Sequence, residues 1–288
     1  NKAGSGLYLC GEKANSQGAI DLGILPGAKG LGAQAMLAAA KAGELSALYV
    51  VGEDLLTSYP NQPLVAAALD KVDFLVVQDL FLSPTAEKAD VVLPATSFAE
   101  KDGSFTNAER RIQRVRPGIP SPGEARSDFA IFQLLAERLG SSNAMSPAAV
   151  CSQLGSLAAG YSGLNLQALG PQGQVWGGET LAVTKRRVVA VTGGQAIESR
   201  FQLITGSALY HSGTMSTRAK GPQAVVAEPY LEFGREDAKE LALKDGDRVK
   251  VKANGVELTL KVKVDRRLPK GVVFAPYHFA EAGLNKLY

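Results

Sequence analysis

The chain has 288 residues, of which 45% are hydrophobic, and its 31 basic and 28 acidic residues leave a net charge of only +3. This length exceeds that of a typical single domain, so we expect two domains. A charge so close to balance argues against a general nucleic-acid surface, which needs a concentrated basic face. The sequence also lacks the run of about 18 apolar residues that a membrane-spanning helix requires.

The two cysteines, Cys10 and Cys151, are far apart and form no C-x-x-C pair. This spacing encodes neither a disulfide framework nor a zinc or iron–sulfur site, so we expect no metal site here. No signal peptide opens the chain, which starts at Asn1 rather than at a methionine. We therefore expect a fragment of a longer polypeptide.

Apolar strands and helices alternate in the first part of the chain. The expected strands are Leu7–Cys10, Ala47–Val51, Phe74–Val77 and Val91–Leu93, and the expected helices are Ala35–Ala42, Pro63–Leu69 and a short one that opens at Ser83. This alternation predicts an α/β domain, residues 1–190, with a doubly wound parallel sheet and right-handed crossovers. Three glycines, Gly27, Gly30 and Gly32, form a G-x-x-G-x-G pattern that gives only weak support for a phosphate site, because no strand directly precedes it.

A polar loop follows the last of these strands. The apolar run ends at Pro94, and Glu100–Gln113 should lie in the crevice beyond the carboxyl ends of the strands, where parallel sheets bind ligands. Its carboxylates lie next to Lys101 and Arg110, so we expect ion pairs rather than acid–base catalysis. The four loop arginines indicate a solvated loop or a contact with a partner's carboxylates; they are Arg110, Arg111, Arg114 and Arg116.

A helix should restart after this loop, capped by Ser127 or Asp128 and closed by Gly140. Its apolar side chains recur at three- and four-residue spacing and are expected to pack on the sheet; they are Phe129, Phe132, Leu135 and Leu139. The region Gly155–Gly178 is rich in glycine and poor in charge, which predicts a loop that leads out of the first domain.

The last part of the chain, residues 195–288, is predicted to form a small β-barrel domain with one or two short helices. Phe201–Thr205 is expected to be a strand and Arg235–Leu241 a helix. Two alternating segments, Arg248–Ala253 and Val256–Lys263, flank Asn254-Gly255, the pair that a type I′ hairpin turn requires. Lys244–Asp247 reads as a tight turn, whose two carboxylates are too few for a calcium site.

Side-chain catalysis is not predicted. The only histidines are His211 and His278, and neither has an obvious nucleophile or base as a partner in the sequence. His211 lies in a polar run after a strand, which could present hydroxyls and backbone N–H groups to an anion. His278, between Tyr277 and Phe279, is more typical of a packed core residue.

The segment Ala89–Gln113 resembles the signature of the molybdopterin oxidoreductase superfamily. The last part is similar to the C-terminal barrel of that superfamily through Leu203–Gly206, His211–Arg218, Asp237-Ala238 and Asp245–Asp247. More narrowly, five segments resemble the family of G subunits of NADH:quinone oxidoreductases, respiratory complex I; they are Ala14–Ala19, Leu22–Pro26, Val77–Leu82, Leu209–Thr214 and Pro276–Phe279. The resemblance covers nearly the whole chain and is weakest between residues 141 and 199.

The resemblance implies a cofactor cradle, vestigial in this branch, whose residues would be Asn107, Arg111, Gln113, Thr205, Gly206, His211 and Thr214. Two departures from the superfamily pattern favour loss of the cofactor. Arg110 follows Glu109 where glycine is common, and Ser207 follows Thr205-Gly206 where a basic residue is common. Alternatively, Arg110 and Arg111 could bind a pyrophosphate. On balance we expect no cofactor in this chain, and iron–sulfur clusters only upstream of it.

Three functional hypotheses remain. The first is the C-terminal scaffold of the iron–sulfur G subunit, without a redox centre of its own, bound to other subunits of the hydrophilic arm on the cytoplasmic face of the inner membrane. The second is the cofactor-binding half of a working oxidoreductase with a molybdenum or tungsten bis-pterin centre, such as a formate dehydrogenase. The third is a free-standing nucleotide-binding module, which rests on Gly27, Gly30 and Gly32 alone.

Overall fold

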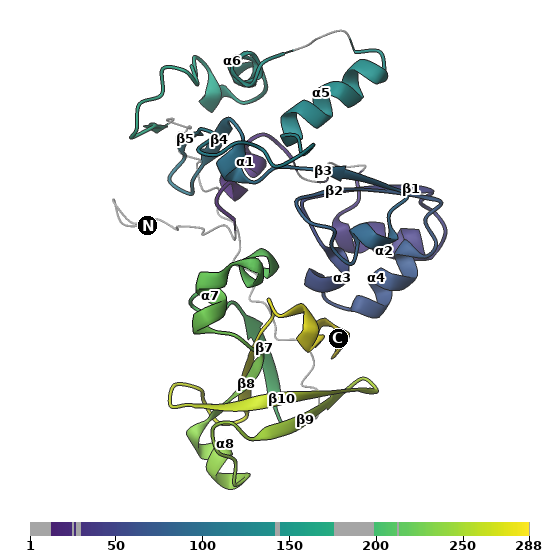
Figure 1. Cartoon of the computed structure of the whole chain (residues 1–288), viewed down its shortest axis with the longest axis vertical. Coiled ribbons are helices and arrows are strands. Elements are labelled where there is room, and N and C mark those ends of the chain that lie inside the picture. Colours follow the sequence, from purple (N-terminus) through teal and green to yellow (C-terminus); the bar gives the residue numbers. More distant parts are fainter. Residues whose placement is uncertain are drawn as a thin grey trace, which may run out of the picture.

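The computed structural model describes residues 13–24, 26, 30–141, 145–175, 199–211 and 213–287. The predicted strand Leu7–Cys10 and Gly27 lie outside these residues. Figure 1 shows a parallel sheet with its helices, a small antiparallel sheet beside it, and a strongly curved sheet formed by the last part of the chain.

The first sheet is parallel, with strands in the order β1-β2-β3. Its strands are β1 (Ala47–Val51), β2 (Phe74–Asp79) and β3 (Val91–Pro94). The helices on one face are α2 (Ala33–Lys41), α3 (Leu55–Ser58) and α4 (Gln62–Leu69), whereas α5 (Asp128–Arg138) lies on the other face (Figure 1). The turn Ala86–Lys88 is a 3₁₀ helix, where the sequence predicted a short helix from Ser83.

The core of this domain lies between the sheet and α2 and α4. It contains Leu37 and Ala40 of α2, Val65 and Ala68 of α4, and Val77 of β2, all nearly inaccessible to solvent. Burial of each of the larger side chains, Leu37, Val65 and Val77, stabilises the fold by about 1.5–3 kcal/mol. The order of strands and helices therefore follows from the apolar pattern of the sequence.

Helix α5 begins where it was predicted, because the Ser127 hydroxyl accepts a hydrogen bond from the Ala130 N–H at 3.2 Å. Its predicted packing face was wrong in part. Ile131 is the buried residue, whereas Leu139 is 86% exposed and Phe132 is 45% exposed. Phe132 still meets the sheet through an edge contact with Tyr49, with ring centroids 6.3 Å apart. The helix thus contacts the sheet mainly through its first turns.

A second, antiparallel sheet has the order β4-β5-β6. Its strands are β4 (Gly103–Thr106), β5 (Arg111–Val115) and β6 (Gln174–Val175), and the helices α1 (Ser16–Asp21) and α6 (Pro147–Leu157) belong to the same part of the chain. The prediction of a loop over Gly155–Gly178 was wrong. This region holds the end of α6, a 3₁₀ turn at Ala159–Tyr161 and β6, and it buries four side chains with Ile112 and Cys151: Tyr161, Leu164, Leu166 and Leu169.

The last part of the chain forms one curved, five-stranded sheet in the order β7-β11-β8-β10-β9. Its strands are β7 (Gln202–Gly206), β8 (Tyr230–Gly234), β9 (Arg248–Ala253), β10 (Val256–Asp265) and β11 (Val272–Pro276). Its helices are η4 (Thr214–Arg218), α7 (Lys220–Val225), α8 (Arg235–Glu240), η5 (Ala280–Ala282) and η6 (Leu284–Leu287). The expected α/β fold with a small barrel is confirmed; the barrel is half closed, with β7 and β9 at its edges.

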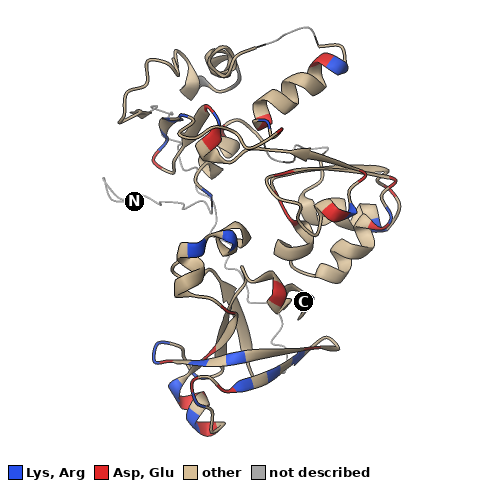
Figure 2. Cartoon of the chain, viewed as in Figure 1, with Lys and Arg blue, Asp and Glu red and all other residues tan. Residues whose placement is uncertain are grey.

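The β9–β10 hairpin has the turn that its sequence predicted, with φ of 48° at Asn254 and 79° at Gly255. Charged side chains gather along it (Figure 2). Glu257 pairs with Lys250 at 2.6 Å and with Lys252 at 2.8 Å, across the two strands. Within the described residues, no helix is long and apolar enough to cross a membrane.

Gly173 marks the closest approach within the antiparallel part. Its φ is 64°, and a Cβ there would lie 2.2 Å from the Ile112 carbonyl oxygen. We expect Gly173→Ala to lower the free energy of unfolding by about 3 kcal/mol, since a left-handed backbone costs about 1–2 kcal/mol and overpacking a further 1–3 kcal/mol. Gly163→Ala is the matched control, because Gly163 has φ of 72° but nothing within 4 Å.

The control should lose only about 1 kcal/mol, the backbone term alone. Urea denaturation of the two variants measures both values. Equal losses would contradict the steric origin of the effect.

Candidate functional site

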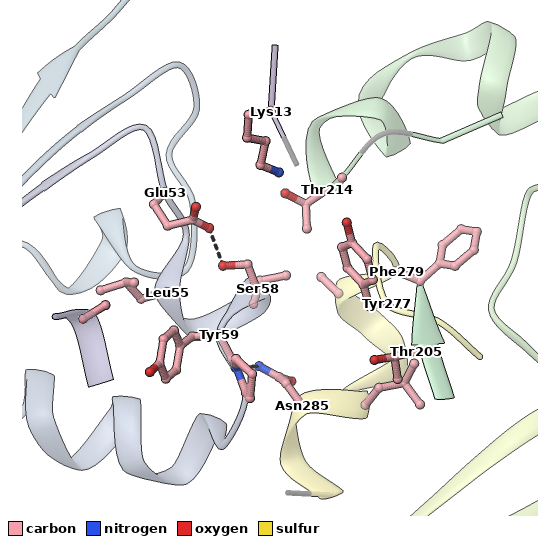
Figure 3. Close-up of a pocket in the computed structure, with 16 residues that line it drawn as sticks. Lys13, Glu53, Leu55, Ser58, Tyr59, Thr205, Thr214, Tyr277, Phe279 and Asn285 are labelled. Atoms are coloured by element: carbon pink, nitrogen blue, oxygen red, sulfur yellow. Dashed lines mark hydrogen bonds between the residues drawn. The ribbon is translucent and has the colours of Figure 1, made fainter. Parts of the chain in front are cut away.

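The domains of the parallel sheet and the half barrel face each other across a cavity of about 450 Å³ (Figure 3). One wall is the segment that follows β1 and includes α3. The other wall combines the end of β7, the start of η4 and the segment after β11. The cavity thus lies beyond the carboxyl end of β1, where open parallel sheets usually bind ligands. The polar residues that line it include Lys13, Glu53, Thr57, Ser58, Thr205, Thr214, Tyr277 and Asn285, of which Lys13 and Glu53 carry opposite charges.

The first wall is fixed by a hydrogen-bonded loop. Thr85 donates its hydroxyl to the Asp54 carboxylate at 2.6 Å and accepts the Leu56 N–H at 3.0 Å. Ser58 donates its hydroxyl to Glu53 (Figure 3). Because Thr85 is fully buried, these bonds hold the start of α3 against the sheet.

Asn285 connects the two walls. Its side-chain amide donates to the Leu56 carbonyl at 2.8 Å and to the Tyr59 carbonyl at 3.2 Å, so η6 is tied to α3. Neither bond uses the amide oxygen of Asn285, a residue that also lines the cavity. A second link is the Arg218 guanidinium, which lies 4.3 Å from the ring centroid of Phe81.

The crevice also contains Asp79 at the end of β2. Burial is the main reason that its pKa is raised, and the nearby Asp54 raises it further. The Leu80 N–H, Ser83 and Arg218 act in the opposite direction. The effect of Arg218 of the half barrel is the smallest of these, so burial decides the direction of the shift.

The end of β2 is anchored on its other side by a buried amide. Gln78 is fully buried, donates to the Asp128 carboxylate at 2.7 Å and accepts the Tyr49 hydroxyl. Asp128 also pairs with Lys101, which belongs to the polar loop. The network connects the strand, the start of α5 and that loop.

The chemistry of the cavity suits a nucleotide joined to a pyrophosphate. Lys13 provides an ammonium group, and the hydroxyls of Thr205 and Thr214 are short donors for phosphate oxygens, whereas the Ser58 hydroxyl donates to Glu53. Aromatic rings in the lining, those of Tyr59 and Tyr277, offer faces on which a base can stack. The volume falls in the range of about 300–1,000 Å³ that is usual for ligand sites.

The structure brings Thr205 and Thr214 together in this cavity. Gly206 follows Thr205, and its carbonyl accepts the Tyr277 N–H at 3.0 Å. A Cβ at Gly206 would lie 3.0 Å from the Phe274 ring, so glycine allows β7 and β11 to pack closely. His211 is not among the lining residues; it is only 4% exposed and lies behind the wall.

The other predicted site residues lie in the β4–β5 hairpin. Asn107 shapes its turn, since the side-chain oxygen accepts the N–H groups of Glu109 at 3.0 Å and Arg111 at 2.9 Å. Arg111 donates to the Gln172 carbonyl at 3.1 Å, and Gln113 is exposed. None of the three lines the cavity. Their role in binding stays a prediction.

The arginines of this hairpin bond within the chain. Arg114 forms a bidentate pair with Asp102, with N–O distances of 3.0 and 2.9 Å, which lowers the pKa of that carboxyl group. Arg116 donates to the Leu169 carbonyl at 3.4 Å. The expectation that the loop carboxylates form ion pairs is met by Asp102, whereas Glu100 caps the turn at Ser97 instead.

Arg110 has φ of 60°, a left-handed conformation that favours glycine. Its side chain lies beside Asp21 of α1, with Nε 3.8 Å from the carboxylate. The backbone conformation alone therefore explains why glycine is common at this position in the superfamily. The inference that arginine here fills a space needed by a ligand stays a prediction.

Sequence reasoning did not single out Lys13, Ser58, Tyr59 or Asn285. The end of the predicted strand Ala47–Val51 was a usable signal for Ser58 and Tyr59, because ligands bind beyond such ends. Asn285 gave no such signal, since its two acceptors are more than 220 positions away in the sequence. Within the described residues, no group of three His, Cys, Asp or Glu side chains could hold a metal ion.

Comparison with known proteins gives two family matches. Residues 4–138 match the molybdopterin oxidoreductase family, and residues 201–288 match the molybdopterin dinucleotide binding domain. The fold is similar to that of the acetylene hydratase from Pelobacter acetylenicus, with a TM-score of 0.64 and 18% identity over 84% of this chain and 39% of that one.

Two relatives illustrate the range of similar proteins. The NADH-quinone oxidoreductase G 2 subunit of Rhizobium meliloti is 35% identical over 98% of this chain and 36% of its own length. The F420-dependent formate dehydrogenase alpha subunit of Methanocaldococcus jannaschii is 37% identical over 83% of this chain and 39% of its own length. The chain thus spans well under half of the length of either relative.

These matches correct the expectation that the chain has no cofactor. A dinucleotide binding domain and relatives among the formate dehydrogenases point to a region that binds molybdopterin, and the donors and rings of the cavity fit the dinucleotide part of that group. The departures at Arg110 and Ser207 had suggested the opposite. The chain belongs to the molybdopterin oxidoreductase family, as a molybdopterin oxidoreductase domain followed by a molybdopterin dinucleotide binding domain.

Proposed function

We propose that this chain is the part of an oxidoreductase subunit that binds the dinucleotide end of a molybdopterin cofactor. The observation that carries the proposal is the cavity between the two domains, whose lining combines Lys13, hydroxyl groups and aromatic rings. The bound cofactor supplies the redox chemistry. The chain supplies donors to its phosphates and ring faces to its base.

The rest of the cofactor would extend from the cavity toward the β4–β5 hairpin. Lys13 lines the cavity, and Asn15, two residues further on, accepts the Thr106 N–H of β4 at 2.8 Å. This short segment therefore lies between the cavity and the hairpin that holds the predicted site residues Asn107, Arg111 and Gln113. We expect these residues to lie nearer the pterin end.

For the whole protein, we propose the iron–sulfur G subunit of an NADH:quinone oxidoreductase. The Rhizobium meliloti relative of that name matches 98% of this chain, which supports this choice. The partners would then be the other subunits of the hydrophilic arm, on the cytoplasmic face of the inner membrane. Iron–sulfur ligands would come from the part of such relatives that this chain does not match.

A formate dehydrogenase alpha subunit is the second candidate. It is favoured by the Methanocaldococcus jannaschii relative, whose identity of 37% is slightly higher than the 35% of the Rhizobium meliloti relative. The two candidates differ in the electron donor, NADH or formate.

The first prediction concerns the Thr214 hydroxyl in the cavity. Thr214→Val should weaken binding of a nucleotide pyrophosphate about ten-fold, because a lost hydrogen bond to a charged group costs about 1.5–3 kcal/mol. Calorimetry with GDP-mannose, which carries a pyrophosphate diester, measures the affinity. Thr217→Val is the matched control, since Thr217 lies in the same 3₁₀ helix, bonds only the Thr214 carbonyl and is not among the lining residues.

The control variant should stay within about two-fold of the parent, the scatter expected of a surface substitution. Equal weakening in both variants would argue against the cavity as the site. Absence of GDP-mannose binding in the parent, together with absence of any pterin in acid extracts of the full-length subunit, would overturn the proposed function.

The second prediction separates the two whole-protein candidates. If the chain belongs to a G subunit, deletion of its gene should abolish NADH-dependent quinone reduction by isolated membranes and leave formate oxidation unchanged. Loss of formate oxidation with retained quinone reduction would instead support the formate dehydrogenase candidate. Complementation with the full-length gene checks that either loss arises from this protein.

A further inference from the structure

The half barrel has a second cavity, which shares no lining residue with the cavity between the two domains. It is a groove of about 1090 Å³ on the inner face of the curved sheet, and residues of both edge strands line it. Ser199–Leu203, with the start of β7, forms one side, and Val249–Asn254, with most of β9, forms the other. The volume slightly exceeds the range of about 300–1,000 Å³ that is usual for small ligands, so the groove has room for a peptide.

The lining of this groove is mostly apolar and only partly covered. Its floor contains side chains that are at most 5% exposed, among them Leu231, Phe233 and Val273. Toward the two edges, Leu203 and Val251 line the groove but are only partly buried. An occupant with apolar side chains would therefore remove further apolar surface from water, which favours binding.

Strand β9 leaves its outer edge open. In the sheet order β7-β11-β8-β10-β9, it pairs with β10 alone among the described strands. Asp247 accepts the Val262 N–H at 2.7 Å, and in an antiparallel pair every second residue bonds to the partner strand in this way. Arg248, Lys250 and Lys252 therefore direct their backbone N–H and C=O groups away from β10. Such an edge can accept one more strand.

The outward side chains of β9 form a row of positive charge (Figure 2). They are Arg248, Lys250 and Lys252, and the two lysine side chains are 67% and 72% exposed. In the described residues, Glu257 is the one carboxylate that pairs with this row, and both lysines share it. Opposite charges on neighbouring strands are stabilising and like charges are destabilising. A strand added at this edge should therefore carry acidic side chains on its outer face and apolar side chains on its inner face.

This charge disfavours two other occupants of the edge. Pairing of β9 with β9 of a second copy would place two rows of lysine and arginine side by side. The sequence between β6 and β7, residues 176–198, carries three consecutive cations, Lys185–Arg187, against two acidic residues, Glu179 and Glu198. Its net charge has the same sign as that of β9. The row of positive charge therefore favours an acidic segment from another polypeptide.

We propose that the edge of β9 and the adjoining groove bind an extended acidic segment of a partner protein by strand addition. The segment pairs with the backbone of Arg248, Lys250 and Lys252, its acidic side chains face the two lysines, and its apolar side chains enter the groove. The six residues of β9 set the paired length at about six. The inference rests on the half barrel alone and not on the proposed function.

The test measures the affinity of the full-length subunit for two labelled peptides by fluorescence anisotropy. The acidic peptide is Gly-Val-Glu-Val-Glu-Val-Glu-Gly, and the basic peptide has lysine in place of each glutamate. The acidic peptide should bind at least about ten-fold more tightly, because its cross-strand pairs with β9 have opposite rather than like charges. Higher salt should weaken its binding, since these pairs are exposed. Equal affinities, or no binding of the acidic peptide, would overturn the proposal.

Three variants separate the backbone contribution from that of the charge. Lys250→Pro removes an N–H that β9 directs away from β10 and leaves the ladder with β10 intact, so it should weaken binding of the acidic peptide about ten-fold or more. Lys250→Ala removes the charge alone and should weaken binding about three-fold. Lys239→Ala, at an exposed position of α8 outside the groove lining, should stay within about two-fold of the parent. Equal losses in Lys250→Pro and Lys250→Ala would contradict strand addition.

Hydrogen exchange of the parent subunit gives a second measurement that needs no variant. The acidic peptide should slow exchange of the N–H groups of Arg248, Lys250 and Lys252, and leave those of Val249 and Val251, which bond to β10, unchanged. Protection confined to other residues would overturn the proposal. Slow exchange at this edge before the peptide is added would assign the edge to the subunit's own chain, and dimerisation that Lys250→Pro abolishes would assign it to a second copy; either result would also overturn the proposal.

Discussion

The cavity depends on the hydrogen bonds that tie its two separately built walls together, beside the contact of Arg218 with Phe81. Asn285 donates both of its amide protons to carbonyl groups of α3 and the residue after it, at 2.8 and 3.2 Å, although it lies at the far end of the sequence. The first wall follows β1, and the second follows β7 and β11. These two hydrogen bonds therefore hold the two walls in contact beside the cavity.

Much of the fold could be predicted from the sequence because its signals are local. Ala47–Val51 and Phe74–Val77 are apolar runs typical of parallel strands, and Asn254-Gly255 specifies the turn between β9 and β10. Ser127 capped α5 as expected, because a cap needs only residues three positions away. The class and the order of the elements follow from such short-range patterns.

The parts that were missed depend on distant contacts. Four side chains of the region that was predicted to be a loop are buried with Ile112: Tyr161, Leu164, Leu166 and Leu169. Their spacing follows neither a helical nor a strand period, so no sequence pattern indicated their burial. On α5, the three- and four-residue spacing predicted that Phe132 and Leu139 both pack on the sheet, but only Phe132 contacts it, through Tyr49, and Leu139 stays exposed. Only some of the cavity residues were predicted from the sequence. Thr205 and Thr214 were among the predicted site residues, whereas Lys13 and Asn285 line the cavity only because the fold brings distant segments together.

Arg110 shows that a backbone requirement and a ligand requirement can produce the same sequence pattern. The absence of glycine there was taken as a sign of a lost ligand, but the position requires a left-handed backbone, with φ of 60°, and the side chain is directed to Asp21. An arginine in place of glycine at position 110 therefore has a cost in backbone conformation, and it has no necessary effect on the cavity, whose lining does not include Arg110. A conformational preference explains the superfamily glycine without any ligand, and the evidence for a cofactor has to come from the groups that line the cavity and from the family matches.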